Sequence, residues 1–153
     1  MDPALPYYEN ASTEESLTKE SAKMVEVIHT NGGNCGIMSK VGHLDFYVNG
    51  GSSQLNIDFD SKLLKMAQKF NVRSHILAFA FYIESINCKK GFYGRLCISQ
   101  EYLNKEYCKG QAVKMGGFRI NETLKNFDLS GIKEGSYYVK TNEKHPHDRG
   151  LDF

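Results

Sequence analysis

Apolar and β-branched residues gather in two short runs in the first third of the chain. Residues 24–30 (MVEVIHT) alternate in part between apolar and polar positions, and residues 43–48 (HLDFYV) form a second run. A glycine-rich turn signal follows each of them, NGGN at residues 31–34 and NGG at residues 49–51. Short runs of this composition that end at turn residues are typical of buried strands, so both segments are predicted to be strands.

Two later segments follow helical spacing. Residues 59–70 (FDSKLLKMAQKF) predict a short amphipathic helix. The apolar residues near one of its faces are Leu63, Leu64, Met66 and Phe70. Ser74 belongs to the residue types favoured at N-caps, and a longer, mostly buried helix is predicted from about His75 to Ile86.

The other segments predict little regular structure. Residues 3–16 contain two prolines and a polar cluster, which favours an extended loop, and the chain after Cys88 is predicted to be loop-like. Residues 117–120 and 136–140 are short strand candidates within that region. The polar tail, Thr141 to Phe153, is predicted to be frayed.

The composition is that of an ordinary globular protein. The chain has 153 residues, 41% hydrophobic and 24% charged, which suffices for about one domain. We expect that domain to cover residues 1–150, with residues 151–153 as a tail. A net charge of +1 gives no basic footprint for nucleic acid. The longest apolar run, Ile76 to Ile83, has eight residues, whereas a membrane span needs roughly 18, so a transmembrane segment is excluded.

The cysteines and glycosylation signals bear on the compartment. The four cysteines, Cys35, Cys88, Cys97 and Cys108, lack the paired C-x-x-C spacing of a zinc site. Two N-x-S/T sequons begin at Asn10 and Asn121, and they are acceptors only in a secreted protein. Against secretion, the chain opens on Met1-Asp2-Pro3 and has no apolar signal segment.

Asp2 and His75 are the candidate catalytic residues. An acid followed at a distance by a histidine matches the last two members of the Ser, Asp, His order in α/β-hydrolases, where the acid orients the imidazole that takes the serine proton. Spacing alone is a weak signal. The alternative interpretation is a loop-capping aspartate and a histidine at the start of a helix.

Several local motifs, in order, make the signal specific. They are MDPALP (residues 1–6), VIHTNGG (27–33), VGHLDFYVNGG (41–51), SH (74–75) and YIESI (82–86). Together they closely resemble the pancreatic-lipase family, which contains animal neutral lipases and insect phospholipases A1. The resemblance runs from residue 1 to about residue 150. It implies an α/β class, with the chain forming a partial α/β-hydrolase fold: the C-terminal half of the sheet, the lid segment and the helix after the catalytic histidine.

The resemblance assigns the catalytic pair. The family's G-L-D-P-A motif aligns with residues 1–4 and makes Asp2 the triad acid, and its C-S-H or C-N-H motif aligns with residues 73–75 and makes His75 the general base. The acid position of other α/β-hydrolases, after the first predicted strand, is Asn31, which cannot supply a carboxylate.

No nucleophile accompanies this pair. The 153 residues contain no G-x-S-x-G, and Gly51-Ser52-Ser53 lacks the closing glycine. The family places this nucleophile elbow before the catalytic aspartate. We therefore expect a C-terminal portion of a lipase catalytic domain, from a truncated gene model or a shortened product, that is inactive alone because acid and base have nothing to activate.

The resemblance also concerns the lid and the disulfides. The two cysteines that close the family's lid are replaced by Ile57 and Arg73, which implies a short lid with Leu63, Leu64, Met66 and Phe70 meeting lipid; a plain surface helix is the alternative. Cys97 and Cys108 match a family disulfide. Cys35 and Cys88 are hypothesised to form a second one.

No metal site and no cofactor are expected. The positions that align with the calcium ligands of some relatives are Thr13, Thr18 and Ser21, whose side chains are not carboxylates. His145 and His147 are expected to be solvated. His29 and His43 are expected to be structural, and Asp45 is expected to lie in a buried hydrogen-bond network.

The resemblance implies a secreted carboxylic ester hydrolase of lipids, of the triacylglycerol lipase or phospholipase A1 type, in lipid catabolism. Its expected partner is a lipid ester at an interface, with no nucleic acid. The alternative from another class is a non-catalytic, lipid-binding or yolk-type relative that keeps the fold without the chemistry.

Overall fold

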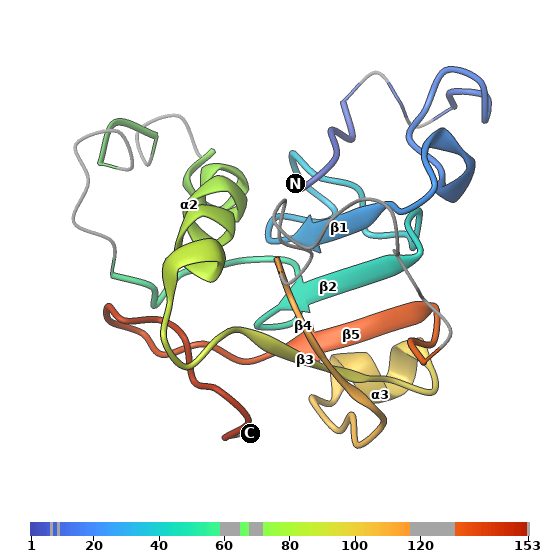
Figure 1. Ribbon diagram of the computed structural model, residues 1–153. Helices are drawn as coiled ribbons and strands as arrows, with labels where there is room; N and C mark the ends of the chain where they lie inside the picture. The colour runs from blue at the N-terminus through green and yellow to red at the C-terminus, as the bar shows by residue number, and fades with distance from the viewer. Residues whose placement is uncertain (7, 9, 59–64, 68–71, 117–130, 153) are drawn as a thin grey trace.

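A computed structural model describes residues 1–6, 8, 10–58, 65–67, 72–116 and 131–152. Its centre is a five-stranded sheet in the order β1-β2-β5-β3-β4 (Figure 1). The first three strands in this order are parallel, and β3 runs antiparallel to both β5 and β4. A parallel group with an antiparallel flank makes the sheet mixed, as is common in α/β folds.

The parallel strands are the ones that the apolar pattern predicts. They are β1 (Glu26–His29), β2 (Leu44–Val48) and β5 (Gly135–Val139). All five residues of β2 are buried, because a central parallel strand is covered on both faces. Alternate residues of the strands therefore serve two separate cores.

Helices cover the two faces. On one face Phe46 and Tyr137 pack against α2 (Arg73–Asn87) through Leu77 and Phe81. On the other face Tyr47 and Tyr138 pack with Leu103 of α3 (Gln100–Asn104). A short 3-10 helix, η1 (Lys19–Ser21), precedes β1. In the described residues no helix is long and apolar enough to cross a membrane.

The start of α2 corrects one prediction. The helix begins at Arg73 with Val72 at the N-cap, so Ser74 lies inside the first turn. The Ser74 hydroxyl accepts a hydrogen bond from the backbone N–H of Gln54 at 3.0 Å. Ser74 is therefore not the N-cap, because its oxygen serves a neighbouring loop instead of its own helix.

The region after Cys88 is more regular than predicted. It contains β3 (Tyr93–Leu96), α3 and β4 (Ala112–Lys114). The strand candidate at residues 117–120 lies outside the described residues. Of the predicted helix at residues 59–70 only Lys65–Ala67 is described, and these three residues are helical.

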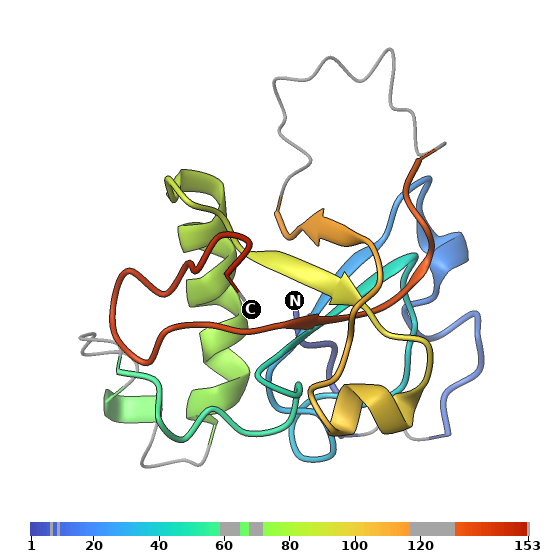
Figure 2. The same cartoon turned by 90° about the horizontal axis from the view of Figure 1, so that it is seen from below.

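The C-terminal tail is ordered against the rest of the fold, so the prediction of a frayed tail is wrong. Figure 2 shows it returning from β5 towards α2. His147 is fully buried, so the expectation that it is solvated is wrong, and Asp148 is 3% exposed. The Asp148 carboxylate accepts hydrogen bonds from the backbone N–H groups of Lys90 and Gly91, at 2.8 and 3.0 Å. Polar residues can be buried here because each finds a distant partner.

Candidate active site

Asp2 lies beside the carboxyl end of β1. Its backbone N–H donates to the carbonyl of Ile28 at 2.6 Å, and its side chain is buried against Gly36. A Cβ at position 36 would lie 2.5 Å from the carboxylate. Glycine is needed at position 36 because the carboxylate occupies the space of a side chain.

Both oxygens of the Asp2 carboxylate are engaged. Oδ1 accepts hydrogen bonds from the backbone N–H groups of Thr30 and Asn31, at 2.9 and 3.2 Å. Oδ2 lies 2.7 Å from Nδ1 of His75. Asn31, at the acid position of other α/β-hydrolases, thus contributes its backbone N–H to the carboxylate of Asp2. These bonds hold the acid in one orientation towards the histidine.

His75 stands in the first turn of α2, and its side chain is 34% exposed. Because Nδ1 donates to Asp2, the neutral imidazole carries its lone pair on Nε2. Among the described residues Nε2 has no hydrogen-bond partner. An oriented, partly exposed imidazole of this kind can accept a proton from a hydroxyl group that comes within hydrogen-bond distance of Nε2.

The loop before α2 tethers this histidine. The Arg73 guanidinium donates to the carbonyls of Gln54, at 3.0 Å, and Ile57. The side chain of Gln54 is buried, donates to the carbonyl of Val48 at 2.7 Å and accepts from Asn49 at 3.0 Å. Gln54 therefore connects the end of β2 to the start of α2. Sequence reasoning missed this role, since a glutamine in a loop carries no chemical signal.

A second histidine–aspartate pair lies in the interior. His29 Nε2 is 2.8 Å from Asp45 Oδ1, both side chains are fully buried, and the His29 ring stacks on Tyr47. Asp45 also accepts from the backbone N–H groups at positions 41 and 42. His43 accepts from the backbone N–H of Val25 at 3.0 Å. These residues are structural, as the sequence predicts.

Two of the four cysteines form a disulfide and the other two are free thiols. Cys97 and Cys108 form a disulfide with the Cα atoms 4.6 Å apart. Cys35 and Cys88 are free thiols, so the hypothesised second bridge is wrong. The Cys88 thiol donates to the carbonyl of Ser85 within the last turn of α2, and burial raises its pKa. Even numbers of cysteines do not determine pairing, because only spatial proximity does.

Of the four predicted lid residues, only Met66 is among the residues that the structure describes. Leu63, Leu64 and Phe70 lie outside the described residues, and the side chain of Met66 is 53% exposed. Of the positions aligned with calcium ligands, Ser21 accepts from the backbone N–H of Thr18 at 3.1 Å. The expected absence of calcium stays a prediction.

Comparison with known proteins identifies the family of the chain. The Lipase family matches residues 1–147. The chain is 30% identical to pancreatic triacylglycerol lipase of Cavia porcellus over 94% of its own length and 34% of that protein. It is 35% identical to pancreatic lipase-related protein 2 of Bos taurus, over 77% of the chain and 29% of the relative.

One shorter match has a higher sequence identity. Over 54 residues the chain is 52% identical to phospholipase A1 member A of Rattus norvegicus, which covers 35% of the chain and 12% of that protein. The chain thus spans about a third or less of the length of these relatives. The Lipase family has the α/β-hydrolase fold, with which the mixed sheet is compatible. Because the family match covers nearly the whole sequence, this chain belongs to the pancreatic-lipase family of lipid ester hydrolases.

Proposed function

We propose that Asp2 and His75 are the acid and the general base of a carboxylic ester hydrolase that acts on acylglycerols or phospholipids. The observation that carries the proposal is the 2.7 Å contact between Asp2 Oδ2 and His75 Nδ1. The other ring nitrogen of His75, Nε2, has no hydrogen-bond partner among the described residues. The nucleophilic serine would come from polypeptide beyond these 153 residues, which contain no G-x-S-x-G.

The proposed reaction is acyl transfer through an acyl-enzyme. His75 Nε2 takes the serine proton as the serine oxygen attacks the ester carbonyl, and Asp2 stabilises the imidazolium that forms. His75 returns the proton to the departing alcohol, which leaves an acyl-enzyme. Water loses a proton to the same nitrogen, attacks the acyl group and releases the fatty acid with the serine restored.

Exposed apolar surface supports the need for further polypeptide. Phe79, Tyr82, Ile83 and Ile86 of α2 are each at least 37% exposed. Their spacing places them on one side of the helix, along one continuous stripe. In a complete catalytic domain this stripe would be covered by packing.

The disulfide supports an extracellular location. A bond such as the one between Cys97 and Cys108 forms and persists in an oxidising compartment, as it does in secreted proteins. We propose secretion on this ground.

Triacylglycerol and phospholipid both stay in the proposal, because lid residues that would meet the lipid lie largely outside the described residues.

The test uses the upstream transcript sequence joined in frame to this chain. The joined protein is assayed on triacylglycerol and phosphatidylcholine emulsions, beside Asp2→Asn, His75→Ala and the exposed control Asp152→Asn. We expect kcat to fall about 1,000-fold or more in the first two variants, with KM little changed, and the control to match the parent. Full activity in His75→Ala would overturn the proposal.

Lipid binding without catalysis is the second candidate, and the missing G-x-S-x-G in this chain is the observation that favours it. It predicts that the joined protein floats with phosphatidylcholine vesicles and releases no fatty acid. In that case Asp2→Asn and His75→Ala would leave flotation unchanged.

A further inference from the structure

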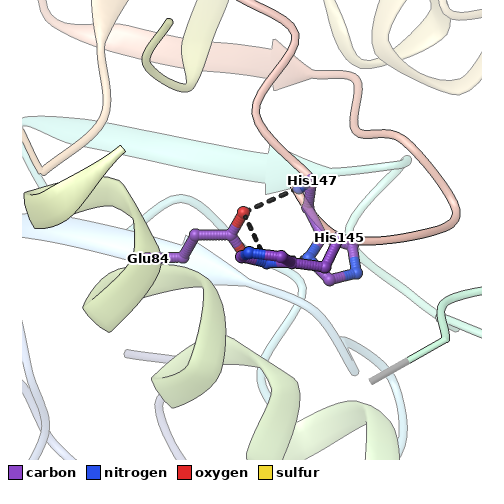
Figure 3. A group of neighbouring side chains, drawn as sticks. All are labelled: Glu84, His145 and His147. Atoms are coloured by element: carbon purple, nitrogen blue, oxygen red, sulfur yellow. Dashed lines mark hydrogen bonds and ion pairs between the residues drawn. The ribbon is translucent and has the colours of Figure 1, made fainter. Parts of the chain in front are cut away.

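Three potential metal ligands meet beside the last turns of α2, away from the Asp2–His75 pair. Glu84 projects from the helix, and His145 and His147 approach it from the C-terminal segment (Figure 3). His147 Nδ1 lies 2.7 Å from Glu84 Oε2, and His145 Nδ1 lies 3.5 Å from Glu84 Oε1. One ligand atom from each residue lies within 4.8 Å of the other two.

The contacts of His147 call for a cation. Its Nε2 is 3.0 Å from the carbonyl oxygen of Asp58, which only accepts hydrogen bonds, so Nε2 carries a hydrogen. Its Nδ1 faces a carboxylate oxygen, which is also an acceptor. A neutral imidazole has one N–H, so with Nε2 donating to Asp58 the lone pair of Nδ1 faces the Glu84 carboxylate, an arrangement that a bound metal ion would make favourable.

Both oxygens of the Glu84 carboxylate face His147. Oε1 accepts a hydrogen bond from the backbone N–H of His147 at 2.6 Å, and Oε2 lies 2.7 Å from Nδ1 of its ring. Two imidazoles and a carboxylate are a common zinc ligand set, which leaves a fourth position for water. The Asp58 carbonyl accepts from the other ring nitrogen of His147, a contact that commonly orients a metal-bound histidine.

The geometry requires only a small adjustment. Ligand atoms of a tetrahedral zinc ion at about 2 Å lie about 3.3 Å from one another. The 2.7 Å contact between Nδ1 and Oε2 must therefore widen slightly, and the widest separation, 4.8 Å at most, must contract by about 1.5 Å. His145 can supply this movement because its side chain is 74% exposed. By contrast, the His29–Asp45 pair is fully buried and has no third ligand grouped with it among the described residues, so it stays a hydrogen bond.

We propose that Glu84, His145 and His147 bind a transition-metal dication, with Zn²⁺ as the preferred ion. The ion joins the C-terminal segment to α2, the helix that carries His75. This site lies apart from the ester chemistry and does not depend on the nucleophile.

The experiment uses the untagged chain, stripped with a chelator and titrated with ZnCl₂ alone. We expect one zinc ion per chain by elemental analysis and calorimetry, and a rise in Tm on addition of zinc. His145→Ala should weaken zinc binding at least tenfold and abolish the rise in Tm. Circular dichroism should show it folded, because the side chain is exposed.

Two controls separate this site from other zinc binding. Lys144→Ala changes an exposed neighbour and should bind zinc like the parent chain. Cys35→Ser/Cys88→Ser removes the two free thiols and should also bind one ion. The proposal is overturned if the parent chain binds no zinc, or if His145→Ala binds it with unchanged affinity.

Discussion

The Arg73 guanidinium donates a hydrogen bond to the carbonyl of Ile57, and these are the two positions at which the resemblance places the cysteines of a lid disulfide. A second bond from the same guanidinium reaches Gln54 at 3.0 Å. Residues 57 and 73, which flank the predicted lid segment, are therefore linked in this chain by non-covalent means, two residues before His75.

Removal of the Arg73 side chain tests this link. Arg73→Ala should lower the free energy of unfolding by about 1–3 kcal/mol, because two charge-assisted hydrogen bonds are lost. Urea denaturation measures the change. Arg73→Lys keeps the charge but lacks the planar fork, so it should recover only part of the loss. Equal stability of Arg73→Ala and the parent would contradict the tether.

Asp2 should also matter to stability. Asp2→Ala leaves the buried N–H groups of Thr30 and Asn31 without their acceptor, so we expect a loss of about 2–4 kcal/mol in the free energy of unfolding. Asp2→Asn keeps one carbonyl oxygen and should lose less. Urea denaturation of both variants checks the order, with the exposed Asp152→Ala as the control. An Asp2→Ala variant as stable as the control would show that these bonds contribute nothing.

Glu26 makes stability depend on pH. Burial raises its pKa from 4.5 to about 7, and a hydrogen bond from the Gly116 N–H only partly offsets this. The folded state thus keeps a proton that the unfolded state loses near pH 4.5, so this group's contribution falls as pH rises from about 4.5 to 7 and is constant above. Glu26→Gln should remove that slope and, at pH 8, stabilise by roughly 1–3 kcal/mol.

Thermal denaturation between pH 4 and pH 8 measures this slope. The exposed Glu14→Gln serves as the matched control and should follow the parent chain. If Glu26→Gln follows the parent chain as well, Glu26 titrates normally in the folded state and the expectation fails.

The disulfide closes a short loop that contains α3. The two cysteines are 11 residues apart in the sequence, for which the loop-entropy relation gives about 3 kcal/mol of stabilisation. Cys97→Ala/Cys108→Ala should lose about that much in urea denaturation, and a reductant should produce the same loss in the parent chain. The variant itself should be insensitive to the reductant. Cys35→Ser, which changes a free thiol, should denature like the parent.

The sequence predicts the elements whose residues are buried in regular patterns. The strands β1, β2 and β5 and the helix α2 are recognisable because each presents several apolar residues at fixed spacing. The segments β3, α3 and β4 each contain only two apolar or aromatic residues, so no hydrophobic run or period stands out from the residues around them. Sheet pairing across the fold and the disulfide hold them in place.

The candidate site is likewise only partly predictable from the sequence. Asp2 and His75 are 73 residues apart, and only the family resemblance pairs them before the fold is known. The roles of Gln54 and Arg73 have no sequence signal, since they depend on backbone carbonyls that a loop brings near. The burial of His147 has none either, because its partner Glu84 lies 63 residues earlier on a helix. Polar contacts over such separations leave no local pattern.

The helix α2 is held near both of its ends by carboxylate–imidazole pairs that reach opposite ends of the chain. His75 in its first turn bonds to Asp2, and Glu84 near its end bonds to His147. The two helix positions are nine residues apart, about 14 Å along the axis. Truncation after residue 144, a common choice when polar tails are trimmed for crystallisation, would release one end of the helix that carries His75. Deletions in this protein should therefore be placed in internal surface loops, and Asp2 and His147 should both be retained.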